Sequence, residues 1–118
     1  MIVDDDPSFL AGLRALLESE GFDAVGEALN GHDGVVAATA LDPDLVLVDV
    51  NLPDIDGFEV VERLAAVGGA PPVVLTSIHA AADFGSLVET SPARAFITKG
   101  DLTGEALAAY LDGGPASA

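Results

Sequence analysis

The sequence predicts an α/β fold, a single three-layer doubly wound domain in which helices cover both faces of a parallel β-sheet. Short apolar runs alternate with amphipathic segments about five times, and the connections between them are short, which is the pattern of such folds. Residues 45–48 are apolar without interruption, as expected of a strand that is buried on both faces of the sheet. The chain has 118 residues, and 50% of them are hydrophobic, so it can form one domain with a core of its own.

The chain begins with a strand and a helix. Residues 1–3 predict a very short strand that ends at three consecutive acids. A helix is expected over residues 7–20, because Pro7 suits its first position and Asp6 can cap its amino end. The helix has one apolar face, formed by Phe9, Leu10, Leu13, Leu16 and Leu17.

A second strand and a second helix lead to the central strand. Residues 22–28 alternate loosely between polar and apolar and predict a strand. An alanine-rich helix is expected over residues 32–40, after the turn at Asn30-Gly31 and before the stop at Asp42-Pro43.

The second half continues the alternation. A third helix follows Gly57, with Phe58, Val61 and Leu64 on one face. Residues 73–75 predict the fourth strand, which stops at the hydroxyl residues Thr76 and Ser77.

The last elements are a short helix over residues 83–89, a strand over residues 93–98 and a helix from a Thr103 cap to about residue 111. We expect one domain over residues 1–112, with residues 113–118 as a flexible tail or the start of a linker.

Polar side chains follow four of the predicted strands. Because parallel strands all end at one edge of the sheet, these residues are expected to meet there. They are Asp4, Asp5 and Asp6 after the first strand, Asp49 after the third, Thr76 and Ser77 after the fourth, and Lys99 after the fifth.

Such a group of carboxylates favours a bound cation. Two carboxylates about 4 Å apart repel by roughly 4 kcal/mol at an effective dielectric constant of about 20, so either a proton or a cation must compensate. Carboxylate and carbonyl oxygens suit Mg²⁺, which keeps sites open for substrate phosphate. With Lys99, the only lysine of the chain, the group predicts a phosphoryl-transfer site in which Asp49 is the nucleophile or a metal ligand.

Other residues carry simpler interpretations. Asp6 is expected to be a helix cap, and neither His32 nor His79 has a histidine or cysteine at ligand spacing. Phe96 can be a core residue of the last strand. No glycine-rich phosphate-binding fingerprint occurs in the sequence.

Composition narrows the function classes. The net charge is −16, from 20 acidic and 4 basic residues, which disfavours direct binding to nucleic acid or to an anionic membrane. There is no cysteine, so disulfides, thiolate zinc sites and thiol nucleophiles are excluded. No membrane span or signal peptide is recognised, and a cytoplasmic protein is expected.

Four motifs in order resemble the receiver domain of two-component response regulators. They are Val3-Asp4-Asp5, the segment from Leu47 through Asp49 to Gly57, Leu75-Thr76-Ser77 and Phe96-Ile97-Thr98-Lys99. The resemblance covers essentially the whole chain. It implies a flavodoxin-like, five-stranded parallel sheet in the order 2-1-3-4-5, flanked by five helices.

The resemblance also implies a role for each site residue. Asp49 would be the phospho-acceptor, and Mg²⁺ would be held by Asp5, Asp49 and the backbone carbonyl of Asn51, with Asp4 as the second member of the acidic pair. Thr76 and Lys99 would contact the phosphoryl group. Phe96 matches an aromatic switch position coupled to Thr76, although it lacks the hydroxyl of the commoner tyrosine.

The partners that the resemblance implies are a sensor histidine kinase or a histidine phosphotransfer protein, and an output domain or partner protein of unknown kind. The chain would act in signalling, catalysing only its own phosphorylation and slow dephosphorylation. A homodimer, and the choice between a stand-alone receiver and a piece of a longer regulator, are left open.

Two alternatives compete with this interpretation. A receiver-like docking module would need no phosphorylation. A haloacid-dehalogenase-like phosphatase also uses a strand-end aspartate with Mg²⁺. Such phosphatases have an Asp-x-Asp motif, however, and in this chain Asn51 occupies the position of the second aspartate.

Overall fold

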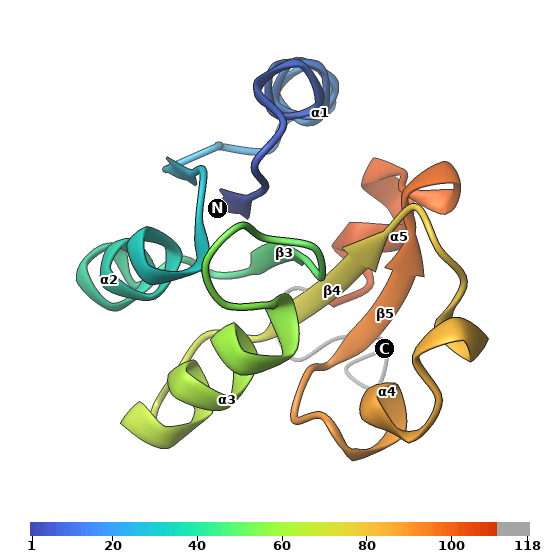
Figure 1. Cartoon of the computed structure of the whole chain (residues 1–118). Coiled ribbons are helices and arrows are strands. Elements are labelled where there is room, and N and C mark those ends of the chain that lie inside the picture. The colour runs from blue at the N-terminus through green and yellow to red at the C-terminus, as the bar shows by residue number, and fades with distance from the viewer. Residues whose placement is uncertain (111–118) are drawn as a thin grey trace.

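A five-stranded parallel sheet forms the centre of the molecule, with the strands in the order β2-β1-β3-β4-β5 (Figure 1). The structure is a computed structural model of the chain, and it describes residues 1–110. The strands are β1 (Ile2–Val3), β2 (Glu27–Ala28), β3 (Val46–Asp49), β4 (Val73–Ser77) and β5 (Ala95–Thr98). The predicted fold class and strand order are therefore confirmed.

Residues 1–110 contain five α-helices and two short 3₁₀ helices. They are α1 (Pro7–Ser19), α2 (Gly31–Leu41), α3 (Gly57–Val67), η1 (Ala81–Phe84), α4 (Ser86–Thr90), η2 (Lys99–Asp101) and α5 (Gly104–Ala108). The elements follow one another in the predicted alternation, and each of the first three helices begins at a side-chain cap, which is Asp6, Asn30 or Asp56.

The sheet separates two hydrophobic clusters, which makes the fold three-layered. Helices α2 and α3 pack on one face, where Val46 and Val48 of β3 belong to their cluster. Helices α1 and α5 pack on the other face, where the intervening Leu47 joins theirs. Alternate residues of β3 thus serve opposite faces, and all four are buried, as expected for the central strand of a sheet covered on both sides.

Two predicted elements differ clearly from the structure in extent. Only Glu27–Ala28 of the expected strand over residues 22–28 is a strand. These two residues pair with β1, and the earlier part of the segment forms no strand pairing. The expected helix over residues 83–89 is divided into η1 and α4 at Gly85, whose φ of 59° is in the left-handed region. In α1, Leu10, Leu13 and Leu17 are buried as expected, and Leu16, which was expected beside them, is 42% exposed.

The C-terminal prediction is tested only in part. Thr103 caps α5 as expected, with its hydroxyl accepting from the backbone N–H of Ala106. The predicted end of this helix near residue 111, the domain boundary at residue 112 and the tail over residues 113–118 lie outside the described residues. Within residues 1–110, no helix combines the length and the apolar character needed to cross a membrane.

Candidate functional site

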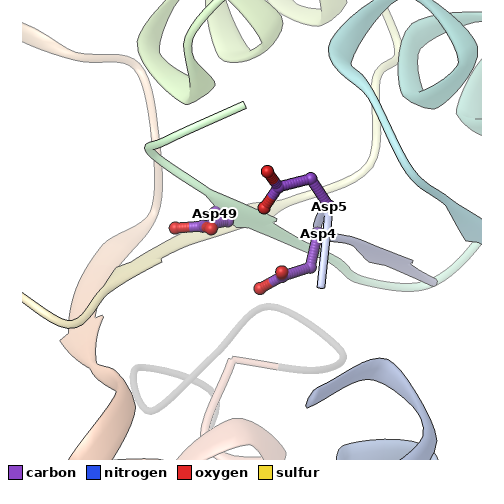
Figure 2. Close-up of side chains that lie close together, drawn as sticks. All are labelled: Asp4, Asp5 and Asp49. Atoms are coloured by element: carbon purple, nitrogen blue, oxygen red, sulfur yellow. The ribbon is translucent and has the colours of Figure 1, made fainter. Parts of the chain in front are cut away.

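Three carboxylates from two strands meet at the carboxyl edge of the sheet (Figure 2). Asp4 and Asp5 follow β1 directly, and Asp49 is the last residue of the neighbouring strand β3. One oxygen atom from each of the three side chains lies within 4.8 Å of the others. The parallel pairing of β1 with β3 brings these side chains together, because Val3 is aligned with Val48.

The three acids differ in their access to solvent. Asp4 is almost fully buried, and its Oδ1 accepts a hydrogen bond of 2.9 Å from the backbone N–H of Asp6. Asp5 is exposed, whereas Asp49 is buried. The site is therefore closed on the side of Asp4 and open on the side of Asp5. Asp6 points away as the predicted cap, and its Oδ1 accepts from the N–H of Ser8 at 3.0 Å.

Lys99, the first residue after β5, reaches these three acids, and the site formed by Asp4, Asp5, Asp49 and Lys99 is called the acidic pocket below. Its Nζ lies 2.8 Å from Oδ2 of Asp4 and 3.5 Å from Oδ2 of Asp49. Burial by itself would lower the pKa of Lys99, but the contacts with Asp4 and Asp49 outweigh it and raise the pKa above its usual value. The only lysine of the chain is thus held as an ammonium ion between two acids.

The surroundings of Asp49 change the ionisation of its carboxyl group. Burial raises the pKa of its carboxyl above the ordinary value, and the negative charge of Asp4 raises it further. Lys99 and the backbone N–H of Asn51 oppose this shift and favour the carboxylate. The net effect is a raised pKa, so the carboxylate form of Asp49 would gain from any additional positive charge nearby.

Thr76 lies beside Asp49 on the next strand. The two residues are aligned in the β3–β4 ladder, and Thr76 is fully buried within β4 rather than placed after it as predicted. Its Oγ1 has no hydrogen-bond partner among the described residues. A buried hydroxyl without a partner is costly, and such groups are often found where a ligand supplies the missing bond.

The buried oxygen Oδ2 of Asp4 is held by its ion pair with Lys99 and has no other polar partner within residues 1–110. The three carboxylates form a hard oxygen donor set of the kind that suits Mg²⁺. The residues present therefore fit this cation.

The loop between β3 and α3 carries Asn51. Its backbone N–H donates to Oδ1 of Asp49 at 3.3 Å, so the start of the loop is tied to the pocket. The loop returns so closely to the strand that a Cβ atom on Gly57 would lie 2.5 Å from the backbone oxygen of Asp49 and 2.9 Å from Cα of Val50. Only glycine fits at this position without moving the backbone that holds Asp49.

Replacing Gly57 with alanine is therefore expected to lower the free energy of unfolding by about 1–3 kcal/mol. Urea denaturation measures this change. Gly12→Ala is the matched control, because a Cβ on Gly12 meets no atom within 4 Å and alanine favours its helix. Equal denaturation midpoints for the two variants would contradict the close approach of the loop to β3.

Asp54 is a residue of this loop that sequence reasoning missed. Its carboxylate accepts hydrogen bonds from the N–H groups of Gly31 at 2.7 Å and His32 at 2.8 Å. Burial acts in the opposite direction, but these backbone bonds lower the pKa of Asp54 to about 2. Asp54 thereby joins the loop to the amino end of α2, and the acidic loop composition was the only signal of such a cap.

The remaining candidates lie around the pocket rather than in it. Phe96 is half-buried on β5, and its ring centroid lies 5.7 Å from that of Phe84. Phe84 in turn contacts Phe58 at 5.6 Å. His32 contacts Arg63 and Asp54, and His79 packs on Phe84. Neither histidine belongs to the acidic group.

A family model described as the response regulator receiver domain matches residues 1–111. Among curated proteins, the chain is 34% identical to the nitrate/nitrite response regulator NarL of Escherichia coli K12 over 79 residues, which is 66% of this chain and 37% of NarL. It is 42% identical to the DNA-binding response regulator MtrA of Mycolicibacterium smegmatis over 79 residues, which is 65% of this chain and 33% of MtrA. The chain thus spans about a third of the length of these relatives.

Solved structures show the same fold. The two-component response regulator of the LuxR family from Aurantimonas sp. SI85-9A1 superposes with a TM-score of 0.82 and 27% identity, covering 92% of this chain and 79% of that one.

Proposed function

The chain belongs to the family of response regulator receiver domains, and from this premise we propose that Asp49 accepts a phosphoryl group in a Mg²⁺-dependent reaction. The observation that carries the proposal is the contact of one ammonium, from Lys99, with two of the three converging carboxylates. Receiver domains generally act in signalling, with histidine kinases as phosphoryl donors and output domains as effectors. The donor proposed here is a histidine kinase or a histidine phosphotransfer protein.

In the proposed reaction, a carboxylate oxygen of Asp49 attacks the phosphorus atom. The new O–P bond forms as the bond between phosphorus and the donor breaks, and the donor leaves with that electron pair. Burial makes the Asp49 carboxylate poorly solvated, so little water must be displaced before it reacts. Lys99 is placed to balance the negative charge that the phosphoryl oxygens bring.

Asp4, Asp5 and Asp49, with the carbonyl of Asn51, would hold the cation. When bound, Mg²⁺ would neutralise charge on the transferring phosphoryl group. Asp5 is exposed, so the site is open to solvent on that side. A site that must admit a phosphoryl donor needs such an opening.

The phosphoryl group would alter the surface through Thr76 and Phe96. A phosphoryl group adds close to two negative charges and three acceptor oxygens, and Thr76, which is aligned with Asp49 on the neighbouring strand, has a buried hydroxyl without a partner among the described residues. The adjoining α4 segment has only five residues and no buried side chain, so it can be rearranged at low cost. The proposed signal is a population shift in this segment and in the ring of Phe96.

Intact mass spectrometry after incubation with acetyl phosphate tests the proposal. The native chain is expected to gain one phosphate with Mg²⁺ and none with excess EDTA. No gain under either condition would contradict the proposal and would favour a docking module that works without phosphorylation.

We also expect Ile78 to lengthen the lifetime of the phosphorylated state. It follows β4 directly and is 73% exposed, and we propose that its apolar side chain limits the access of attacking water to the site. Ile78→Glu is expected to shorten the dephosphorylation half-life several-fold, since a carboxylate can orient that water. Val36→Glu, at an equally exposed apolar residue on α2, is the control. An unchanged or longer half-life in Ile78→Glu would refute this role.

A further inference from the structure

An aromatic ring lies against the ammonium group of the pocket. Phe9, in the first turn of α1, is half-buried, and Nζ of Lys99 lies 4.1 Å from the centroid of its ring. This distance is well within the range in which an ammonium is attracted to the negative face of an aromatic ring. Lys99 therefore has three neighbours at its charged end, two carboxylates and one ring.

The surroundings strengthen this contact. The side chain of Lys99 is only 15% exposed, and a cation–π contact is stronger when water is largely excluded. The first turn of α1 is held in place by the cap from Asp6, whose Oδ1 accepts from the N–H groups of Ser8 and Phe9. The ring is thus mounted on a rigid element next to the acids.

We propose that Phe9 is a positioning residue for phosphoryl transfer, because its ring face holds the ammonium of Lys99 beside Asp49. This inference rests on the proposed function of the pocket. The ring carries no net charge, so it attracts the ammonium without competing for a cation or repelling a phosphoryl group, as a third carboxylate partner would. Phe9 also packs against the cluster formed by α1 and α5, and an aliphatic side chain would supply that packing alone.

Two substitutions of Phe9 distinguish the effect of the aromatic ring from the effect of apolar packing. Phe9→Leu keeps an apolar side chain and removes the ring, whereas Phe9→Trp restores a ring face that binds cations at least as well. We expect Phe9→Leu to slow phosphate uptake from acetyl phosphate about three- to tenfold, and Phe9→Trp to recover most of the native rate.

A structural readout is available because the chain has a single lysine. In protein labelled with ¹³C-lysine, the ring current of Phe9 is expected to shift the ε-methylene signal of Lys99 upfield relative to Phe9→Leu. Phe9→Trp should keep an upfield shift. This comparison needs neither Mg²⁺ nor phosphate, so it reports the contact separately from activity.

The outcomes distinguish this inference from the proposed function. If the native chain takes up no phosphate, the proposed function fails, and the positioning role fails with it even where the upfield shift is seen. If the native chain is phosphorylated but Phe9→Leu reacts at the native rate, or Lys99 gives the same methylene shift in both proteins, only the role of Phe9 is overturned. The same holds if a folded Phe9→Trp is as slow as Phe9→Leu.

Discussion

Asp49→Asn is expected to take up no phosphate under conditions in which the native chain gains one phosphate from acetyl phosphate and Mg²⁺. Asparagine has nearly the same shape as aspartate, so the packing around this buried residue is preserved. Its amide lacks the anionic oxygen that attacks phosphorus. Lys99 keeps its contact with Asp4 at 2.8 Å, so the substitution leaves no isolated ammonium behind. Intact mass spectrometry gives the result directly.

The matched control for this experiment is Asp42→Asn. Asp42 caps the C-terminus of α2 with a φ of 48°, a conformation that asparagine tolerates well. Like Asp49→Asn, the Asp42→Asn substitution removes one acidic group from the chain, but it does so at an exposed position. Phosphate uptake that survives in Asp49→Asn, or disappears in Asp42→Asn, would overturn the assignment of the site to the acidic pocket.

The convergence of Asp4, Asp5, Asp49 and Lys99 could be predicted because it depends mainly on topology. Each of these residues follows or ends an apolar run, and the ends of parallel strands share one edge. Local sequence was therefore enough to indicate which side chains meet. The same reasoning placed Thr76 at this edge, although it lies inside β4 rather than beyond it. The roles of these residues in binding and transfer remain predictions.

Contacts that depend on the placement of one element against another could not be predicted. Asp54 caps a helix that begins 23 residues earlier, and nothing in the local pattern links the two. Phe9 was recognised only as part of an apolar helix face, since its contact with Lys99 requires the orientation of α1 relative to β5. Gly85 divides the segment that was predicted as one helix over residues 83–89, because its φ of 59° lies in the left-handed region.

The acidic pocket is also expected to reduce the stability of the metal-free chain. Asp49→Asn should therefore have a larger free energy of unfolding than the native chain at pH 7 without Mg²⁺, by on the order of 1 kcal/mol. The reason is that burial and the charge of Asp4 disfavour the Asp49 carboxylate in the folded state. Urea denaturation in EDTA measures the difference.

The pH dependence of that difference follows from the direction of the shift. The pKa of Asp49 is raised on folding, so the folded state binds this proton more tightly than the unfolded state. The native chain is then favoured below the unfolded pKa of about 4, and it loses stability as pH rises through the folded pKa. The free energy of unfolding of Asp49→Asn should therefore exceed that of the native chain as pH rises through the folded pKa, but not below pH 4. An equally large difference below pH 4 would mean that the charge of Asp49 is not its cause.

Mg²⁺ is expected to reverse the order of the two proteins. A ligand that binds only the folded state at 100 times its dissociation constant stabilises it by about 2.7 kcal/mol. The native chain offers the cation three carboxylates, and Asp49→Asn offers two, so the variant should gain much less. The same acids that destabilise the metal-free pocket would then become the source of its stability, and their cost in the metal-free state would underlie the affinity for a divalent ion. If Mg²⁺ stabilises both proteins equally, the cation does not bind between Asp4, Asp5 and Asp49.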